Sequence, residues 1–526
     1  MCDNFPCVHT TEDRVDERKS SASEGIWIAW VLAGTAIVIQ MLTNGRYGYF
    51  RDELYYLAAS DHLAPGYVDF APLIAWLARA SRIVFGDSLH AIRLLPAAAL
   101  CMEVLLTGFI AREFGGRRWA VLLGCVSVLL CPTILANADR LSMNPLEPVF
   151  WMGCVYFLVL AVKRQEPRLL PWCGVMLGLG LENKHSTVFF LGALVAGLLL
   201  SPERRLLATK WFWIAAAIAL LIALPNFVWQ YQHGFPTLED LRNVKATHKN
   251  IELPPGSFLL QQVMMLNPAT APVWIAGLGF LLFHREGKRY RFLGISYLAF
   301  LVVMMVLHGK DYYVAPIYPM LFAAGGVFWE TLAQERPRLR WARTVVLVTV
   351  LIGGCLSAPV VLPILPPDRV LPYFSALGIG ISRTETGMKS LLPQYFADEF
   401  GWPEMVETVA QVYNSLPPEQ RAKTAILAGN YGGAGAIDFF GPRYGLPKAI
   451  SAHQNYYYWG PREYTGESVI LLEWRLKDAE YWCGSVEQGP VNAPYWGMGW
   501  EHYTILICRD FKKPLAEAWP RLKTWN

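Results

Sequence analysis

Arg51, Asp52 and Glu53 stand side by side directly after the first long apolar segment of the chain. Ionisable groups at the mouth of a membrane helix are costly and usually have a function. A carboxylate at a water–lipid boundary can accept a proton from a hydroxyl, and partial burial improves it as a base near neutral pH. We therefore predict that Asp52 is the general base of an enzyme acting on a lipid-borne substrate. The alternative is that the triplet merely ends a helix and its charges pair in water.

Three further polar segments interrupt the apolar pattern, namely 137–148 (NADRLSMNPLEP), 182–186 (ENKHS) and 308–313 (HGKDYY). The first is also typical of a helix cap followed by a turn. Lysine and arginine side chains at the outer ends of several helices, close to a carboxylate pair, could hold a lipid phosphate and stabilise it as a leaving group. Together the segments favour an enzyme.

The elements that position these residues are membrane helices. The 526 residues are 54% hydrophobic and 17% charged, and the mean hydropathy is +0.28. About 11 apolar runs are long enough to be read as crossings, and they lie at 25–42, 92–111, 119–136, 147–162, 169–182, 187–200, 211–229, 271–283, 292–307, 313–330 and 343–363. The basic residues, net charge +4, form no nucleic-acid-binding face.

Charge in the connections predicts the topology, with the N-terminal tail 1–24 in the cytoplasm. Every second connection is rich in basic residues and is assigned to the cytoplasm; these are Arg112, Arg117, Arg118, Lys163, Arg164, Arg168, Arg204, Arg205, Lys210, Arg285, Lys288, Arg289, Arg291, Arg336, Arg338, Arg340 and Arg343. The polar segments above, the loop 44–91 and everything after 363 then share the outer face.

The outer loop 44–91 departs from this charge rule, since it contains Arg46, Arg51, Arg79 and Arg82. A local anion such as a phosphate would account for them. Within the loop, 72–84 has apolar residues at helical spacing and is expected to form an amphipathic helix on the membrane surface. A plain interfacial anchor is an equally good interpretation of that helix.

Residues 364–526 have the composition of a soluble α/β domain, which makes 25–363 the transmembrane domain. Strands are expected at 424–429, 468–474 and 503–508, and a helix at 402–416. The glycine-rich run 429–435 (GNYGGAG) lacks the lysine of a phosphate-binding loop, and a structural turn is expected there. Cys483 and Cys508 are the only cysteines of this domain, and export would make a disulfide between them favourable.

The ordered motifs RDELYYLAASDHLAPGYVDFAPLIAWL, RLSMNPLEPVFW, GLGLENKHS and HGKDYYVAPIYPMLFAAG resemble the bacterial membrane glycosyltransferases of family 39 and their relatives. That group has the GT-C fold and includes protein O-mannosyltransferases and transferases that modify lipid A. NYGGAGAIDFFGPRYGLPKAISAHQNYYYWGP resembles the extracytoplasmic domain of the same subgroup. The resemblance covers almost the whole chain.

The resemblance implies an inverting glycosyltransferase that moves a sugar from a polyprenyl-phosphate carrier to a hydroxyl of a glycolipid, polysaccharide or protein. It implies a bacterial inner-membrane protein with its C-terminal domain in the periplasm. The base maps onto Asp52 with Glu53 beside it, and the second acidic position onto Asp139 or, as a weaker match, Glu147. Contacts to the donor phosphate map onto Arg51, Lys184, His308, Lys310 and Tyr312.

Asp69 stands where lipid A-modifying members have a Glu-Lys-Pro element, and it is a further candidate for positioning the acceptor or a metal. A role in a turn is equally open. Some relatives bind a divalent ion near the acidic pair, but this sequence shows no ligand set. The rival interpretations are a lipid or solute transporter, which would show inverted repeats and broken helices near mid-membrane, and a catalytically inactive scaffold.

Overall fold

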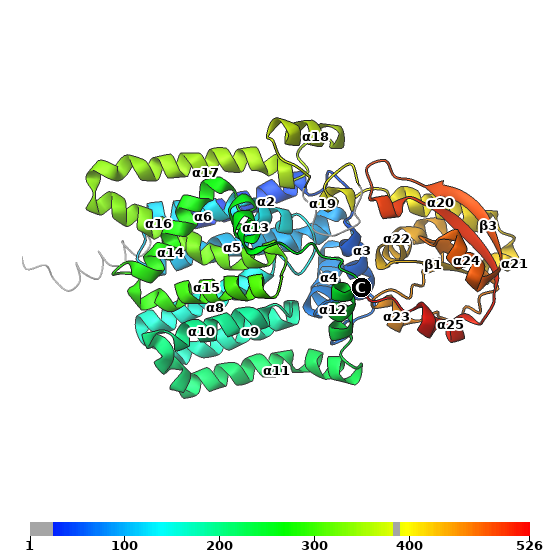
Figure 1. The fold of residues 1–526 in the computed structure, drawn as a ribbon, viewed down its shortest axis with the longest axis horizontal. Coiled ribbons are helices and arrows are strands. Elements are labelled where there is room, and N and C mark those ends of the chain that lie inside the picture. The colour runs from blue at the N-terminus through cyan, green and yellow to red at the C-terminus, as the bar shows by residue number, and fades with distance from the viewer. Residues whose placement is uncertain (1–24, 382–389) are drawn as a thin grey trace, which may run out of the picture.

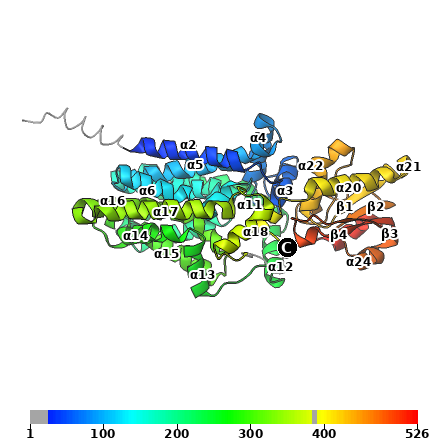
Figure 2. The ribbon, with the colours of Figure 1, turned by 90° about the horizontal axis from the view of Figure 1, so that it is seen from above.

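The fold was analysed in a computed structural model that describes residues 25–381 and 390–526. The predicted cytoplasmic tail 1–24 lies outside these residues. A long bundle of helices occupies one end of the molecule and a smaller α/β part the other (Figure 1). Short helices of the outer loops lie between the two parts, as the view from above also shows (Figure 2).

Every predicted apolar run is confirmed as helix, because each is long, apolar and bounded by Pro, Gly or charged residues. The α-helices of this part are α2 (Ile26–Thr43), α3 (Arg51–Ser60), α4 (Leu73–Phe85), α5 (Leu89–Glu113), α6 (Arg118–Leu129), α7 (Pro132–Ala138), α8 (Glu147–Arg164), α9 (Leu170–Asn183), α10 (Thr187–Leu199), α11 (Lys210–Gln232), α12 (Pro236–Ala246), α13 (Pro255–Met264), α14 (Ala271–Phe283), α15 (Arg291–Val306), α16 (Tyr318–Glu335), α17 (Arg340–Val361) and α18 (Pro367–Ala376). Short 3-10 helices join them at η1 (Pro167–Leu169), η2 (Pro202–Ala208), η3 (Pro268–Thr270), η4 (Lys288–Tyr290), η5 (Asp311–Ile317) and η6 (Pro337–Leu339).

Five spans in the described residues are long and apolar enough to cross a membrane by themselves, namely Ile26–Thr43, Leu89–Glu113, Lys210–Gln232, Lys288–Val306 and Pro337–Val361. Up to eight qualify if the bent pairs α6–α7, α10–η2 and α13–α14 each count as one span. The predicted count of about 11 therefore depends on α8, α9 and α16, which do not meet this test of length and composition. The bends fall where Pro132, Pro202 and Pro268 start a new helix, since proline cannot continue the preceding one.

Helix α5 lies near the centre of the bundle and packs against α2, α6, α8 and α16. Small residues allow the close approach of its neighbours, as a Cβ added at Gly108 would come within 2.6 Å of the Ala29 methyl group. Large apolar side chains on α11 and α17 are instead exposed, among them Trp213, Leu221 and Ile352. An exposed apolar surface of this kind is suited to lipid.

The α/β part is built on a four-stranded sheet with the order β1-β2-β4-β3. Its strands are β1 (Thr424–Ala428), β2 (Ser468–Leu472), β3 (Cys483–Asn492) and β4 (Tyr503–Phe511), and only β1 and β2 are parallel. The helices of this part are α19 (Gln394–Ala397), α20 (Trp402–Ser415), α21 (Pro418–Arg421), α22 (Tyr431–Phe440), α23 (Tyr456–Trp459), α24 (Leu476–Trp482) and α25 (Leu515–Leu522), with η7 (Gly441–Tyr444) and η8 (Gly499–Glu501). The disulfide Cys483–Cys508, expected from the sequence, is present.

The expected turn at 429–435 is wrong, because α22 begins within it. The side chain of Asn430 accepts hydrogen bonds from the backbone N–H groups of Gly432 and Gly433 and so caps this helix. The glycines then allow α22 to lie directly on α3, since a Cβ at Gly432 would overlap the side chain of Arg51 and one at Gly435 would come within 2.9 Å of the Leu54 carbonyl. This contact joins the two parts of the molecule.

Candidate active site

The predicted triplet lies in the first turn of α3, and its two carboxylates have different surroundings. The carboxylate of Asp52 is about a third exposed, at 32%, whereas Glu53 is fully buried. Adjacent residues of a helix point about 100° apart, so one faces the outer surface and the other the bundle. The two are therefore not interchangeable acids.

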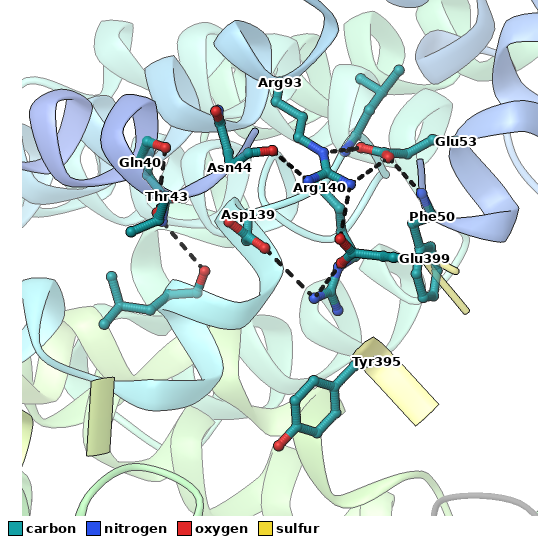
Figure 3. Close-up of polar contacts among 12 residues, drawn as sticks. Gln40, Thr43, Asn44, Phe50, Glu53, Arg93, Asp139, Arg140, Tyr395 and Glu399 are labelled. Atoms are coloured by element: carbon teal, nitrogen blue, oxygen red, sulfur yellow. Dashed lines mark hydrogen bonds and ion pairs between the residues drawn. The ribbon is translucent and has the colours of Figure 1, made fainter. Parts of the chain in front are cut away.

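Glu53 ties α3 to α5 and to the segment that follows α7. Both of its oxygens accept hydrogen bonds from the guanidinium of Arg93 on α5, at 2.8 and 2.7 Å. The backbone N–H groups of Phe50 and Leu141 donate to the same carboxylate at 2.8 and 2.7 Å. With its acceptor positions filled, Glu53 is an anchor of α3 rather than a base (Figure 3).

Arg93 and Arg140 link Glu53 to two further buried carboxyl groups, those of Asp139 and Glu399. Glu399 lies 3.5 Å from nitrogen atoms of both arginines, and an oxygen of Asp139 lies 3.8 Å from Arg140 (Figure 3). The guanidinium of Arg140 also lies over the Phe50 ring, 4.9 Å from its centre. Sequence reasoning found Glu53 and Asp139 but missed Arg93 and Glu399.

This buried cluster holds three carboxyl groups and two guanidinium groups, so one carboxyl group is neutral if the charges balance. Burial raises the pKa of Glu399 to about 8 and that of Asp139 to about 6, against the opposing attraction of the two arginines. Both shifts favour the neutral form of these two carboxyl groups.

A divalent metal ion does not fit this cluster. The positions between the carboxylates are occupied by guanidinium groups, which would repel a cation, and Glu53 has no lone pair free to coordinate one. Among the residues that the structure describes, no group of three or more His, Cys, Asp or Glu side chains is arranged to hold a metal ion.

Asp52 itself is held on one side only. Its Oδ1 accepts a hydrogen bond of 2.7 Å from the hydroxyl of Tyr431 on α22 and lies 3.7 Å from Nε of Arg51. Within the described ranges no protein group hydrogen-bonds to Oδ2. Asp52 is thus a partly exposed carboxylate with one oxygen fixed and the other available to a substrate.

Arg51 is enclosed by aromatic side chains of the C-terminal part. Its guanidinium lies 5.2 Å from the centre of the Tyr431 ring and 5.0 Å from that of Trp500. Such contacts hold the guanidinium group in a fixed position beside Asp52.

Asp69 lies close to this region and not in an isolated turn. One oxygen accepts hydrogen bonds from the hydroxyl of Tyr55 and the side-chain amide of Asn455, at 2.9 and 3.1 Å. Burial, with the negative charge of Asp240 nearby, raises the pKa of Asp69 to about 8. The Tyr55 ring stacks on Tyr431, so the network of Asp69 lies behind the partner of Asp52.

A second cluster surrounds Lys184, which follows α9. Its Nζ contacts Glu147 and Asn144 at 3.0 Å each and lies 4.5 Å from the centre of the Tyr313 ring. Glu147 also accepts a hydrogen bond from Ser186. Lys184 is thus an ion-pair partner of buried Glu147, two predicted residues that the structure brings together.

The segment 308–313 reaches the same cluster through Tyr313. His308 is exposed, and Lys310 and Tyr312 are half-buried where η5 begins. A small cavity lies between η5 and the segment 137–148, and its lining includes Glu103, Asn144 and Pro316. Lys184 and Glu147 thus form a second cluster, which Tyr313 contacts, whereas no contact in the described part of the chain joins His308 to it.

One sequence signal could have identified Glu399. Residues 395–399 read YFADE and residues 49–53 read YFRDE, so the same spacing of aromatic and acidic residues occurs twice. The two segments touch, since the backbone N–H of Arg51 donates to the Asp398 carbonyl at 3.1 Å. Tyr431 carried no such signal, because its role depends on the unforeseen helix α22.

Three comparisons relate the chain to known proteins. The family model of dolichyl-phosphate-mannose-protein mannosyltransferases matches residues 69–229, which include Asp69, Asp139, Glu147 and Lys184. Lipid A galacturonosyltransferase RgtD from Rhizobium johnstonii is 28% identical over 220 residues, which are 41% of this chain and 45% of that protein. The chain thus matches less than half the length of this curated relative.

Solved structures of ArnT from Cupriavidus metallidurans share the fold across nearly the whole chain. The form bound to undecaprenyl phosphate superposes with a TM-score of 0.59 at 13% identity, covering 91% of this chain and 98% of ArnT. The apo form gives a TM-score of 0.57 at the same identity, covering 91% and 97%. The chain therefore has the fold of these ArnT structures, and the predicted fold class is confirmed.

Proposed function

We propose that this chain is an inverting glycosyltransferase that moves a sugar from a polyprenyl-phosphate carrier to a hydroxyl acceptor. The observation that carries the proposal is Asp52, a partly exposed carboxylate at the start of α3 with Oδ2 free for a substrate. The similar proteins support the carrier, since the ArnT structure contains undecaprenyl phosphate and the matching family is named for dolichyl-phosphate-mannose.

In the proposed reaction the acceptor hydroxyl oxygen attacks the anomeric carbon of the sugar. Oδ2 of Asp52 takes the hydroxyl proton as the new carbon–oxygen bond forms. The bond between the anomeric carbon and the phosphate oxygen breaks, and its electron pair leaves with the polyprenyl phosphate. Attack from the face opposite the leaving group inverts the anomeric configuration.

Positive side chains offset the charge that develops on the leaving phosphate. Arg51, 3.7 Å from Asp52 and fixed between two aromatic rings, is the nearest. Lys184, with His308, Lys310 and Tyr312 on the neighbouring segment, is proposed to contact the donor phosphate at the second cluster. Asp139 and Asp69 are proposed to shape the site through their hydrogen-bonded neighbours, with no step assigned to a metal ion.

The proposed setting is the outer face of a bacterial inner membrane, with the C-terminal domain in the periplasm. The alternation of basic connections supports this orientation. The acceptor is proposed to be a glycolipid, a polysaccharide or a protein, and RgtD, whose name specifies lipid A, favours a glycolipid. A transporter would need a substrate path through the membrane, and the predicted polar residues instead gather at the outer helix ends.

The test is a transfer assay on purified protein with a panel of radiolabelled polyprenyl-phosphate sugars and total membrane acceptors. Asp52→Asn should lower transfer by about 10²–10⁴-fold, the usual contribution of a general base. Asp87→Asn is the matched control, because Asp87 is an exposed carboxylate of the same outer region that pairs with Arg82. Near-normal transfer by a folded Asp52→Asn variant would refute the proposal.

A further inference from the structure

Tyr431 belongs to the C-terminal part of the chain, yet its hydroxyl group contacts the proposed base. It donates a hydrogen bond of 2.7 Å to Oδ1 of Asp52, across 379 residues of sequence. Tyr431 is the first residue of α22, and the close packing of this helix on α3 sets the contact. The C-terminal domain therefore reaches into the site.

The aromatic ring of Tyr431 stacks on two other rings. It stacks on Tyr55 at a centroid distance of 4.4 Å with an interplanar angle of 18°, and on His453 at 5.1 Å and 11°. Its backbone N–H donates to Nδ1 of His453 at 3.2 Å. A ring fixed in this way keeps its hydroxyl at a defined position.

The protonation states agree with this geometry. An imidazole that accepts at Nδ1 is neutral, and burial lowers the pKa of His453 to about 3. Burial also raises the pKa of the Tyr431 hydroxyl well above its ordinary value, so it remains a donor. The Tyr431 hydroxyl is thus a neutral hydrogen-bond donor to Asp52 across the physiological pH range.

A hydrogen bond to one carboxylate oxygen has two effects on the base. It favours the ionised form that accepts a proton, and it fixes the side-chain rotamer so that the other oxygen faces the substrate. In Asp52 the free oxygen is Oδ2. No other described side chain provides Asp52 with a hydrogen bond.

We infer that Tyr431 is a positioning residue for Asp52, and that the C-terminal domain completes the active site through it. The inference rests on the proposed function, because it assigns Asp52 as the base. It also gives the domain a direct part in the reaction, separate from any binding of the acceptor.

The test compares Tyr431→Phe with Tyr456→Phe in the full-length protein. Each variant removes one hydroxyl from a buried tyrosine that stacks near Tyr55 and donates to an aspartate, but Tyr456 donates to Asp438. The measurement is kcat/KM as a function of pH. Tyr431→Phe should move the acid limb upward by about one pH unit and lower kcat by about tenfold at neutral pH with little change in KM. Tyr456→Phe should keep the wild-type profile.

Other charged or titratable groups that face this contact are Arg51, Tyr55, Tyr56, Asp69 and His453. Burial keeps the two tyrosines and His453 neutral, and Arg51 remains charged at these pH values. Asp69, whose pKa is raised to about 8, titrates on the alkaline side. The pH profile of Asp69→Asn therefore shows what Asp69 contributes to the alkaline limb, separately from the acid limb.

An acid limb that stays unchanged in a folded Tyr431→Phe variant would overturn the inference. A second measurement covers a variant that is partly unfolded: in the Asp52→Asn background, Tyr431→Phe should cause no further loss of the residual transfer. A full additional loss there contradicts the inference. Retained transfer by Asp52→Asn alone refutes the proposed function instead, so the two failures are distinguishable.

Discussion

The buried ion pair of Lys184 and Glu147 gives Lys184 two roles that one substitution would remove together. Lys184 neutralises Glu147, which is only 2% exposed, and at the same time is a proposed contact for the donor phosphate. A single substitution would mix the two roles, since removing one partner leaves the other charge buried and uncompensated.

Lys184→Met is expected to destabilise the protein by about 3–5 kcal/mol because Glu147 loses its counter-ion. Adding Glu147→Gln should restore most of this stability. If Lys184 contacts the donor phosphate, the double variant should still show a KM for the donor about tenfold above wild type. Thermal unfolding in detergent and donor titration measure the two effects, and a wild-type KM in the double variant would refute the phosphate contact.

Glu399 makes the stability of the site depend on pH. Its folded-state pKa is raised to about 8, above that of an ordinary glutamate, so the folded chain binds more protons than the unfolded chain between those two values. Stability is therefore highest below about pH 4.3 in this respect and falls as pH rises towards 8. Glu399→Gln should reduce the fall of the unfolding temperature between pH 5 and 8. The exposed Glu404→Gln should keep the wild-type slope, and an equal slope in Glu399→Gln would contradict the assignment.

At the scale of elements, the contact of α22 with α3 depends on glycine. A Cβ at Gly435 would lie 2.9 Å from the carbonyl group of Leu54, a backbone group that cannot move aside without shifting α3. The same contact sets the position of Tyr431 against Asp52. A change in the packing of α22 on α3 would therefore also move Tyr431 relative to Asp52.

Gly435→Ala is expected to cost about 1–3 kcal/mol of stability through this overlap and to lower transfer along with it. Gly256→Ala in α13 is the matched control, since a Cβ there meets open space and alanine favours a helix. Thermal unfolding and the transfer assay measure both variants. Wild-type stability and activity in Gly435→Ala would show that the helices can separate without consequence.

The sequence predicted the helices well, because apolar runs bounded by charge leave few alternatives for a chain in a membrane. It also predicted β1, β2 and β4, which are rich in apolar residues, and all residues of β1 and β2 are buried. β3 was missed because most of its residues are exposed and it contains Gly489 and Pro490, which suit an edge strand with a bulge.

In the candidate site, local spacing was enough to find Asp52, Glu53 and Lys184. It could not pair Glu53 with Arg93, or Arg140 with Glu399, because those contacts join segments 40 and 259 residues apart. The long-range partners follow from tertiary packing alone. The same reason explains why α22 was mistaken for a turn. Its glycines allow close packing against α3 and do not mark a bend of the backbone.

At the scale of the whole molecule, the disulfide Cys483–Cys508 cross-links the α/β part and closes a loop with a sequence separation of 25 residues. The chain-entropy relation gives about 3.5 kcal/mol for a loop of this size. A reductant should therefore lower the unfolding temperature of the wild type and leave that of Cys483→Ala/Cys508→Ala unchanged. Cys355→Ala, which removes an exposed free cysteine, should respond to reductant as the wild type does. Insensitivity of the wild type would contradict a stabilising role.

The hydrogen bond between Tyr431 and Asp52 can form only late in the synthesis of each chain. Ribosomes add about 5–20 residues per second, so the 379 residues between the two side chains take about 20–75 s to synthesise. During that interval α3 is already made while its partner helix does not yet exist. A nascent chain therefore lacks the hydrogen bond to Asp52, and a chain truncated before α22 never gains it.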